Sequence, residues 1–220
     1  MIALSTIAPF IEHTLLKPEA TQAAISQLCE EALQYSFAAV CVNPYYISQV
    51  RNLLQGSTVR VCSVIGFPLG ANRTSSKVNE VIGALADGAT ELDMVMNIAA
   101  AKDGDWRTVE DDIAAVVKAA ASQAVVKVII ETALLSEQEK ELACLVAQKA
   151  GATYVKTSTG FASGGATVAD VALMRQTVPQ MRIKASGGIR DLAAAISLLQ
   201  AGANRLGLSA SVALMQEEAR

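Results

Sequence analysis

The chain has 220 residues, of which 52% are hydrophobic, and its 18 basic residues nearly balance its 21 acidic ones. This composition supplies a sizeable hydrophobic core, which excludes a disordered chain, and no cluster of lysines or arginines points to a nucleic-acid or membrane partner. The four cysteines show no Cys-x-x-Cys spacing and the first residues resemble neither a signal peptide nor a membrane span, so we expect a cytoplasmic protein that acts on a small molecule.

Apolar runs of period 2 alternate with stretches of period 3.6 along the whole chain. The period-2 runs predict eight strands, at residues 11–16, 38–42, 59–66, 90–95, 125–131, 153–158, 181–187 and 204–209. Helical patterns lie between them, among others at residues 21–36, 75–88, 136–151 and 190–202. Eight β/α units without a linker favour a single α/β domain over residues 1–220, a (β/α)8 TIM barrel. An open doubly wound sheet is the competing fold, but its Gly-x-Gly-x-x-Gly fingerprint follows none of the strands.

A weak internal repeat supports these boundaries. Three segments each close a helix with Gly-Ala and open a strand: DGATELD (87–93), AGATYVK (150–156) and AGANRLG (201–207). Five residues after the glycine, they carry Asp93, Lys156 and Gly207. A recurring helix-to-strand turn without any function would explain the repeat equally well.

Charged residues fall at strand positions that should face the interior of the barrel. Alternate side chains of a barrel strand point to the helices and to the interior, and the apolar residues of these strands occupy the helix-facing set. The inward set is therefore Glu91, Asp93, Lys127, Lys156 and Lys184, with Glu131 at the end of its strand. A network of salt bridges that only joins strand ends is one explanation, and it is strongest for Lys127. Convergence from four strands favours an active site, because barrel sites are assembled in that way.

Two neighbouring lysines can activate each other. A free lysine has a pKa near 10.4, so it is almost fully protonated at pH 7 and a poor nucleophile. A second ammonium about 6 Å away would lower that pKa by about two units, and partial burial acts in the same direction. Lys156 and Lys184, at matching heights on consecutive predicted strands, meet this requirement, and Asp93 is placed to transfer protons. These residues predict a Schiff-base nucleophile.

Five motifs carry a resemblance to a known family: IEHTLLKP (11–18), VIGFPLG (64–70), ELDMVMN (91–97), YVKTSTGF (154–161) and KASGGIR (184–190). Together they resemble the deoxyribose-phosphate aldolase family, a class I aldolase family, from about residue 11 to residue 211. The resemblance implies that Lys156 forms the Schiff base, that Lys184 depresses its pKa and that Asp93 relays protons. It also implies reversible cleavage of 2-deoxy-D-ribose 5-phosphate to D-glyceraldehyde 3-phosphate and acetaldehyde, with neither a metal nor an organic cofactor.

Two glycine-containing loops are the predicted phosphate site. Barrels commonly bind phosphate at the loops after the last two strands, against a helix N-terminus. SGGIRD (186–191) supplies Gly187 and Gly188, and GLSAS (207–211) supplies Gly207 and Ser209. Backbone N–H groups can approach an anion closely at residues that lack a Cβ atom. Gly160, after the Lys156 strand, is expected to contribute a further N–H group.

Several residues near these motifs admit more than one role. Glu12 stands where the family usually has Asp, so it contacts either a substrate hydroxyl or a neighbouring side chain. Cys41 matches a cysteine that many family members place near the substrate, although a packed thiol explains it as well. His13 should point to the opposite face and act structurally. Thr157 and its neighbours Ser158 and Thr159 are candidates to support water or substrate hydroxyls, or only a turn.

Two other functions compete with the aldolase. A phosphate-binding barrel isomerase or epimerase could use Asp93 as a base and the lysines as clamps, but it would need only one lysine. A catalytically inactive barrel that binds sugar phosphates would leave the Asp-Lys-Lys set unexplained. The expected partners are a sugar phosphate and an aldehyde, without nucleic acid or membrane. The sequence leaves the oligomeric state open, a homo-oligomer included, and the ending MQEEAR lacks the tyrosine tail that some family members use.

Overall fold

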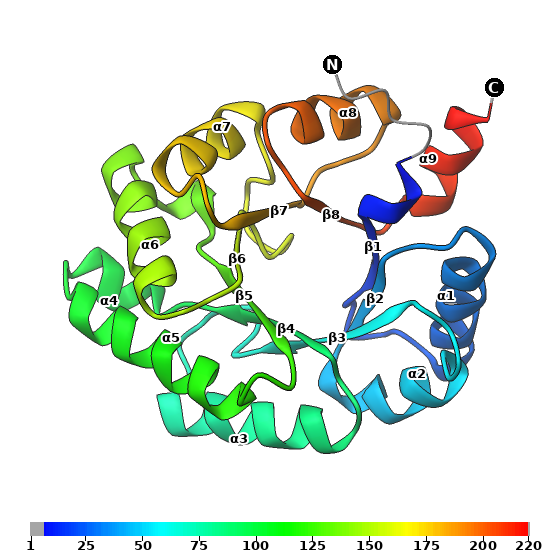
Figure 1. Ribbon diagram of the computed structural model, residues 1–220, viewed down its shortest axis with the longest axis horizontal. Helices are drawn as coiled ribbons and strands as arrows, with labels where there is room; N and C mark the ends of the chain where they lie inside the picture. Colours follow the sequence, from blue (N-terminus) through cyan, green and yellow to red (C-terminus); the bar gives the residue numbers. More distant parts are fainter. Residues whose placement is uncertain (1–6, 220) are drawn as a thin grey trace.

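The computed structural model describes residues 7–219, which form a closed barrel of parallel strands (Figure 1). Each strand pairs with its neighbours in the chain, and the last strand pairs with the first. The strands are β1 (Ile11–Leu15), β2 (Ala39–Val42), β3 (Arg60–Ile65), β4 (Glu91–Val95), β5 (Val125–Ile129), β6 (Tyr154–Lys156), β7 (Arg182–Ser186) and β8 (Arg205–Leu208). The predicted (β/α)8 barrel is confirmed, and the predicted strand limits differ from these by at most two residues.

Helices surround the barrel on its outer side (Figure 1). They are α1 (Gln22–Gln34), α2 (Ile47–Leu53), α3 (Thr74–Ala86), α4 (Ile98–Lys102), α5 (Trp106–Ala120), α6 (Glu137–Lys149), α7 (Val168–Thr177), α8 (Leu192–Gln200) and α9 (Ser211–Glu218). Short 3-10 helices are η1 (Ala8–Phe10), η2 (Pro44–Tyr46) and η3 (Thr132–Leu134). Among the described residues, no helix combines the length and the apolar character that crossing a membrane requires.

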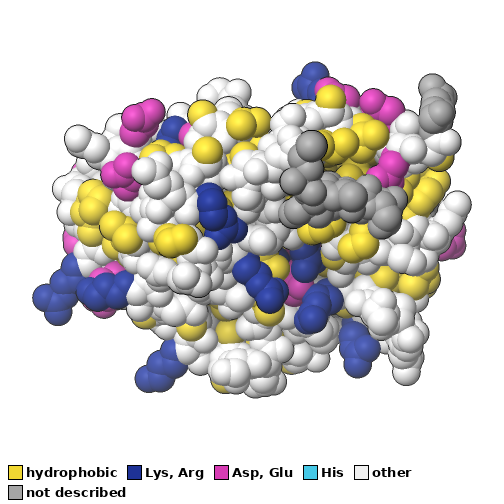
Figure 2. Space-filling view, turned by 45° about the horizontal axis from the view of Figure 1, so that its top comes forward, with side chains coloured by type: hydrophobic (Ala, Val, Ile, Leu, Met, Phe, Trp, Pro, Cys, Tyr) yellow, Lys and Arg dark blue, Asp and Glu magenta, His cyan; other side chains and the backbone are white. Residues whose placement is uncertain are grey.

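The main hydrophobic core lies between the sheet and the helices. Helix-facing strand residues such as Leu92, Val155 and Ile183 are fully buried and belong to one cluster with helix residues such as Ile113. The sorting of strand residues by alternation is therefore correct at these positions. In the space-filling view, hydrophobic side chains occur in small groups, and most of the visible Lys and Arg side chains lie in the middle and lower part of the face shown (Figure 2).

Strand register brings the inward-facing charges to similar heights in the barrel. Lys156 is the register partner of Lys184 on β7, and Asp93 is the register partner of Lys127 on β5. Adjacent parallel strands lie about 4.8 Å apart, so the side chains of register partners that face the interior meet there. The barrel thus gathers ionised groups from β1, β4, β5, β6 and β7 in one buried volume.

Candidate active site

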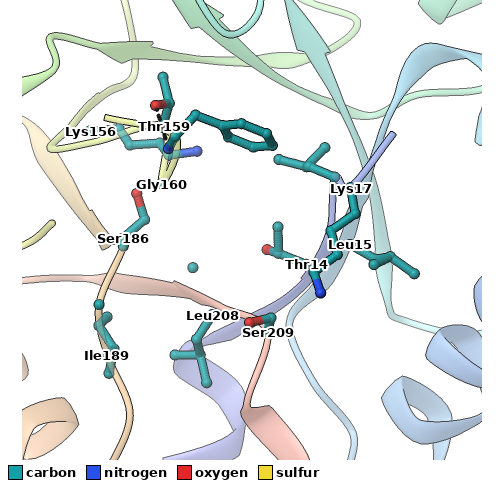
Figure 3. Close-up of a pocket in the computed structure, with 15 residues that line it drawn as sticks. Thr14, Leu15, Lys17, Lys156, Thr159, Gly160, Ser186, Ile189, Leu208 and Ser209 are labelled. Carbon is teal, nitrogen blue, oxygen red and sulfur yellow. Dashed lines mark hydrogen bonds between the residues drawn. The ribbon is translucent and has the colours of Figure 1, made fainter. Parts of the chain in front are cut away.

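A cavity of about 350 Å³ opens at the carboxyl ends of four strands (Figure 3). Its walls come from the ends of β1, β6, β7 and β8 and the loops that follow them: residues 14–17, Lys156, residues 159–161, residues 186–189 and residues 207–209. In the close-up, Thr14 and Lys17 lie across the cavity from Lys156 and Ser186 (Figure 3). This end of a (β/α)8 barrel is where enzymes of this fold place their active sites.

Lys156 and Lys184 share one carboxylate oxygen. The Nζ atom of Lys156 lies 2.6 Å from Oδ2 of Asp93, and the Nζ atom of Lys184 lies 2.6 Å from the same oxygen. The two nitrogens are therefore separated by no more than twice that distance. The structure brings together the three residues that the sequence singled out for catalysis, inside one barrel and beside the cavity.

The other inward charges complete a buried ionic cluster. Lys127 contacts Asp93 Oδ1 at 2.9 Å, Glu91 at 2.6 Å and Glu12 at 3.3 Å. Glu12 also bonds the ammonium of Lys184. Among these side chains three ammonium groups face three carboxylates, so the charges balance, as burial demands. Both ion pairs of Glu12 are thus with neighbouring lysines.

The three lysines differ in how completely they are neutralised. Lys127 contacts three carboxylates, and Lys184 contacts Glu12 and Asp93. Among the described residues, Asp93 is the one carboxylate that Lys156 contacts, and Lys156 shares it with both other lysines. Lys156 is also the lysine of this cluster that borders the cavity. An amine that is weakly neutralised and open to the cavity is the best placed of the three to react with a bound aldehyde.

Two carboxylates of the cluster, Glu12 and Asp93, are held ionised. Burial would raise the pKa of Glu12, but Lys127 and Lys184 outweigh burial and lower the pKa to about 2. Burial would also raise the pKa of Asp93, yet Lys127, Lys156 and Lys184 together hold that pKa well below its usual range. The pKa of Lys184 is shifted in the opposite direction, upward. Burial disfavours its charged form, and Asp93 with Glu12 nevertheless raises its pKa, which keeps Lys184 an ammonium.

The predicted phosphate-binding residues line the cavity as a group. Gly160, Gly187, Gly188, Gly207 and Ser209 all lie in its wall. Gly187 and Gly188 have φ angles of 85° and 75°, a region in which glycine is unstrained, so consecutive N–H groups can turn toward one site. Gly207 has a second reason to be glycine, because a Cβ atom there would lie 2.8 Å from Cε of Lys184.

Other candidate residues lie away from the cavity wall. The Thr157 hydroxyl donates to the Ser186 carbonyl at 3.1 Å and accepts from the Ser186 N–H at 3.1 Å, so it joins β6 to β7 and does not line the cavity. Cys41 is fully buried in a small cluster that includes Cys62. His13 is buried and bonds Glu31 at 2.7 Å, as expected of a structural histidine.

One group of side chains has the donor types of a metal site. Ligand atoms of Glu12, Cys41, Cys62 and Asp93 all lie within 4.8 Å of one another. The two carboxylates are already bound by the ammonium groups of Lys127 and Lys184. A cation would have to displace these lysines or bind beside them, which like-charge repulsion opposes.

The sequence did not indicate every residue of the site. Thr14 and Lys17 line the cavity, and their position at the end of the first predicted strand could have indicated them. Cys62 lies 3.3 Å from Asp93 Oδ1 and 3.4 Å from the Lys127 amine, and an apolar strand pattern gave no sign of this contact. Glu131 was placed inside the barrel without a role, and the structure gives it specific partners.

Comparison with known proteins identifies relatives over nearly the whole chain. The model of the family described as DeoC/LacD family aldolase matches residues 7–216. The deoxyribose-phosphate aldolase of Brevibacillus brevis is 56% identical, over 94% of this chain and 93% of that protein. That of Geobacillus sp. is 56% identical, over 96% of each chain. The tetrameric deoxyribose phosphate aldolase of Aeropyrum pernix has a similar structure, with a TM-score of 0.91 and 35% identity, covering 97% of this chain and 91% of that one.

Proposed function

This chain belongs to the DeoC/LacD family of aldolases, and from that premise we propose that it is a class I deoxyribose-phosphate aldolase with Lys156 as its Schiff-base residue. It cleaves 2-deoxy-D-ribose 5-phosphate reversibly to D-glyceraldehyde 3-phosphate and acetaldehyde. The single observation that carries the assignment of Lys156 is its position: it borders the cavity while its only carboxylate partner, Asp93, is shared with two other ammonium groups.

The reaction begins at the neutral amine of Lys156. The amine attacks C1 of the open-chain sugar, and loss of water forms an iminium ion. Loss of the proton of the C3 hydroxyl then allows the C2–C3 bond to break, and its electron pair moves into the iminium to form an enamine. Glyceraldehyde 3-phosphate leaves. Protonation of the enamine at C2 and hydrolysis release acetaldehyde and restore Lys156. Asp93 is placed to relay these protons because it bonds Lys156 and Lys184 through one oxygen.

Lys184 places a second positive charge beside Lys156. Its own ammonium stays charged, because Asp93 and Glu12 raise its pKa despite burial. The two nitrogens lie no more than about 5 Å apart through the shared Asp93 oxygen, so at an effective dielectric near 20 the two ammonium groups repel each other by about 3 kcal/mol or more. The carboxylate of Asp93 offsets part of that repulsion. Lys127, with three carboxylate partners, contributes less to it.

In this proposal the phosphate group of the substrate binds where the loops after β7 and β8 line the cavity. We assign it to the N–H groups of Gly187, Gly188 and Ser209, with Gly160 and Gly207 in the adjacent wall. Consecutive N–H groups in left-handed turns form concave anion sites. Lys17 also lines the cavity and adds a positive charge for the anion.

The proposal also covers the domain organisation, the oligomeric state and the location of the protein. Residues 1–220 act as a single domain. The relative from Aeropyrum pernix is tetrameric, which supports a homo-oligomer for this chain. The four free and buried cysteines support a reducing, cytoplasmic location.

Reductive trapping tests the covalent step. Brief treatment with borohydride in the presence of acetaldehyde should add an ethyl group to the peptide that contains Lys156, because the reduced Schiff base is a secondary amine. The peptide that contains Lys77, a buried lysine outside the cavity, serves as the internal control and should remain unmodified. A peptide map without an adduct at Lys156, alongside measurable turnover, would refute the covalent mechanism and favour proton-transfer chemistry.

A further inference from the structure

Glu131 lies two residues after the end of β5, which pairs with the strand that carries Lys156, and the reaction described above does not use it. Its side chain is 2% exposed. Its backbone is left-handed, with φ 56° and ψ 68°. A residue with a Cβ atom adopts this conformation only at an energetic cost, and such residues concentrate at functional sites. The carboxylate of Glu131 is therefore expected to have a function that offsets this cost.

A bulge in the pairing of β5 with β6 directs the Glu131 side chain. The Ile130 N–H donates to the Lys156 carbonyl at 3.0 Å, and the Thr132 N–H donates to the Thr157 carbonyl at 2.9 Å. In regular parallel pairing, N–H groups two residues apart reach carbonyls two residues apart. Here they reach consecutive residues, so Glu131 is the extra residue of a bulge. Bulges beside active sites commonly redirect a side chain.

The redirected carboxylate holds one wall of the cavity. Its Oε2 atom accepts two hydrogen bonds from Thr159, one from the hydroxyl at 2.5 Å and one from the backbone N–H at 3.1 Å. The Thr159 hydroxyl oxygen in turn accepts the Phe161 N–H at 3.0 Å. Thr159, Gly160 and Phe161 all line the cavity (Figure 3). The Phe161 ring also packs edge-on against Phe67, at 5.3 Å between centroids.

The surroundings of Glu131 are not arranged for stability alone. Its second oxygen, Oε1, is buried without a hydrogen-bond partner among the described residues, and so are the hydroxyls of Thr132 and Ser158. Unsatisfied buried polar atoms are costly, and a chain under selection only for stability would favour an apolar side chain here. Backbone strain and these oxygens together indicate a functional reason for a carboxylate at this position.

We propose that Glu131 is a positioning residue of the aldolase, which acts by fixing Thr159 and, through it, the cavity wall that receives the substrate. This inference rests on the proposed function. Among the described residues no hydrogen bond joins Glu131 to Lys156 or Asp93, and its carboxylate is bonded to Thr159 instead. Its contribution should therefore appear in substrate binding more than in the chemical step.

Four variants separate these possibilities: Glu131→Gly, Glu131→Gln, Thr159→Val and the Glu131→Gly/Thr159→Val double variant. Glycine adopts the left-handed backbone without strain, so Glu131→Gly removes the carboxylate while leaving the fold intact. Loss of hydrogen bonds to a charged acceptor should raise KM for deoxyribose 5-phosphate by roughly 10- to 100-fold, with kcat changed by less than about threefold. Glu131→Gln keeps an acceptor oxygen and should restore KM to within about fivefold of the native value.

The double variant tests whether Glu131 acts through Thr159. If it does, Glu131→Gly should add little to the KM of Thr159→Val, because residues in one network are not additive. A native KM in Glu131→Gly, or fully multiplicative effects in the double variant, would overturn the proposal. So would a fall in kcat well beyond threefold in both the Gln and the Gly variants, because the carboxylate would then take part in proton transfer.

Thermal melts identify any variant that does not fold, and Glu131→Gln with Thr159→Val then decides the question through KM. Trapping with acetaldehyde and borohydride is run on every variant. An adduct at Lys156 in native protein together with an unchanged KM in the variants would refute only the role of Glu131. Absence of the adduct in native protein would instead refute the proposed function.

Discussion

Two buried lysines of this protein make similar ion pairs and yet have different surroundings. Lys77 on α3 lies 2.5 Å from Asp112 on α5, outside the barrel, where α3 and α5 lie side by side (Figure 1). Lys156 lies 2.6 Å from Asp93 inside the barrel. Both lysines are buried, at 0% and 2% exposure. Burial and a carboxylate partner therefore do not by themselves distinguish a reactive lysine from a structural one.

The difference lies in how each charge is satisfied. Within residues 7–219, Asp112 pairs with no cation other than Lys77, and it accepts a hydrogen bond from Thr74 at 2.8 Å. Lys77 also donates to the Val95 carbonyl at 3.0 Å, and neither residue lines the cavity. Asp93 is divided among three ammonium groups, and the lysine with the fewest partners borders the cavity. We infer that Lys156 can react because its carboxylate partner is shared with two other ammonium groups and because its amine borders the cavity.

Replacing each lysine by leucine should separate the two roles most strongly. Lys156→Leu should abolish borohydride trapping and lower kcat by roughly 10⁴-fold or more while the fold persists, because the nucleophile itself is lost. Lys77→Leu should lower the free energy of unfolding by about 3–5 kcal/mol, because it leaves the Asp112 carboxylate buried without its partner. Its folded fraction should retain trapping at Lys156. Turnover in Lys156→Leu, measured after removal of background protein, would show that another amine forms the Schiff base.

The Lys184→Leu variant tests whether catalysis depends on the sharing of Asp93 among three lysines. Without Lys184, the Asp93 carboxylate is divided between Lys127 and Lys156 alone, so it pairs more strongly with the Lys156 ammonium. We expect kcat to fall by about 10²- to 10³-fold, with near-native circular dichroism. The matched control is Lys140→Leu, which removes a partly buried ion pair with Asp170 outside the cavity. Equal activity in the two variants would contradict the role of Lys184.

The sequence predicted the central cluster well because the alternation of a strand is a local property. Apolar residues at every second position of β4 to β7 left Asp93, Lys127, Lys156 and Lys184 only the interior, and parallel register then brought them together. The strands themselves were predictable for the same reason, since each is short, apolar and bounded by a turn.

The Lys77–Asp112 ion pair and the bulge at Glu131 could not be predicted in the same way. Lys77 lies in SSKVNEV, a pattern typical of an exposed helix face, and its burial depends on the packing of α3 against α5, which is distant in sequence. Alternation placed Glu131 inside the barrel, but only the change of pairing after Ile130 turns its carboxylate toward Thr159. Thr157 shows a related limit, because its sequence position did not reveal that its hydroxyl bonds Ser186.

The smallest expected effect is on the free energy of unfolding in acid. This effect should differ between the buried ionic cluster and an exposed ion pair. The pKa of Glu12 falls from its ordinary value of 4.5 to about 2 on folding, because Lys127 and Lys184 outweigh burial. A carboxyl whose pKa is lower in the folded state stabilises that state fully above its unfolded pKa. The stabilisation is lost as pH falls through the folded pKa, so Glu12 contributes up to about 3 kcal/mol that declines between pH 4.5 and 2.

Denaturant unfolding at a series of pH values between 7 and 3 measures this contribution directly. In Glu12→Gln the free energy of unfolding should be lower at pH 7 and should fall less steeply below pH 4.5, so its curve approaches the native one in acid. Glu110→Gln, which removes an exposed pair with Lys149, should shift stability by less than about 1 kcal/mol at any of these pH values. Parallel curves for native protein and Glu12→Gln would mean that the lysines do not hold Glu12 ionised. The charge balance that keeps Lys156 the least neutralised lysine of the cluster would then need a different origin.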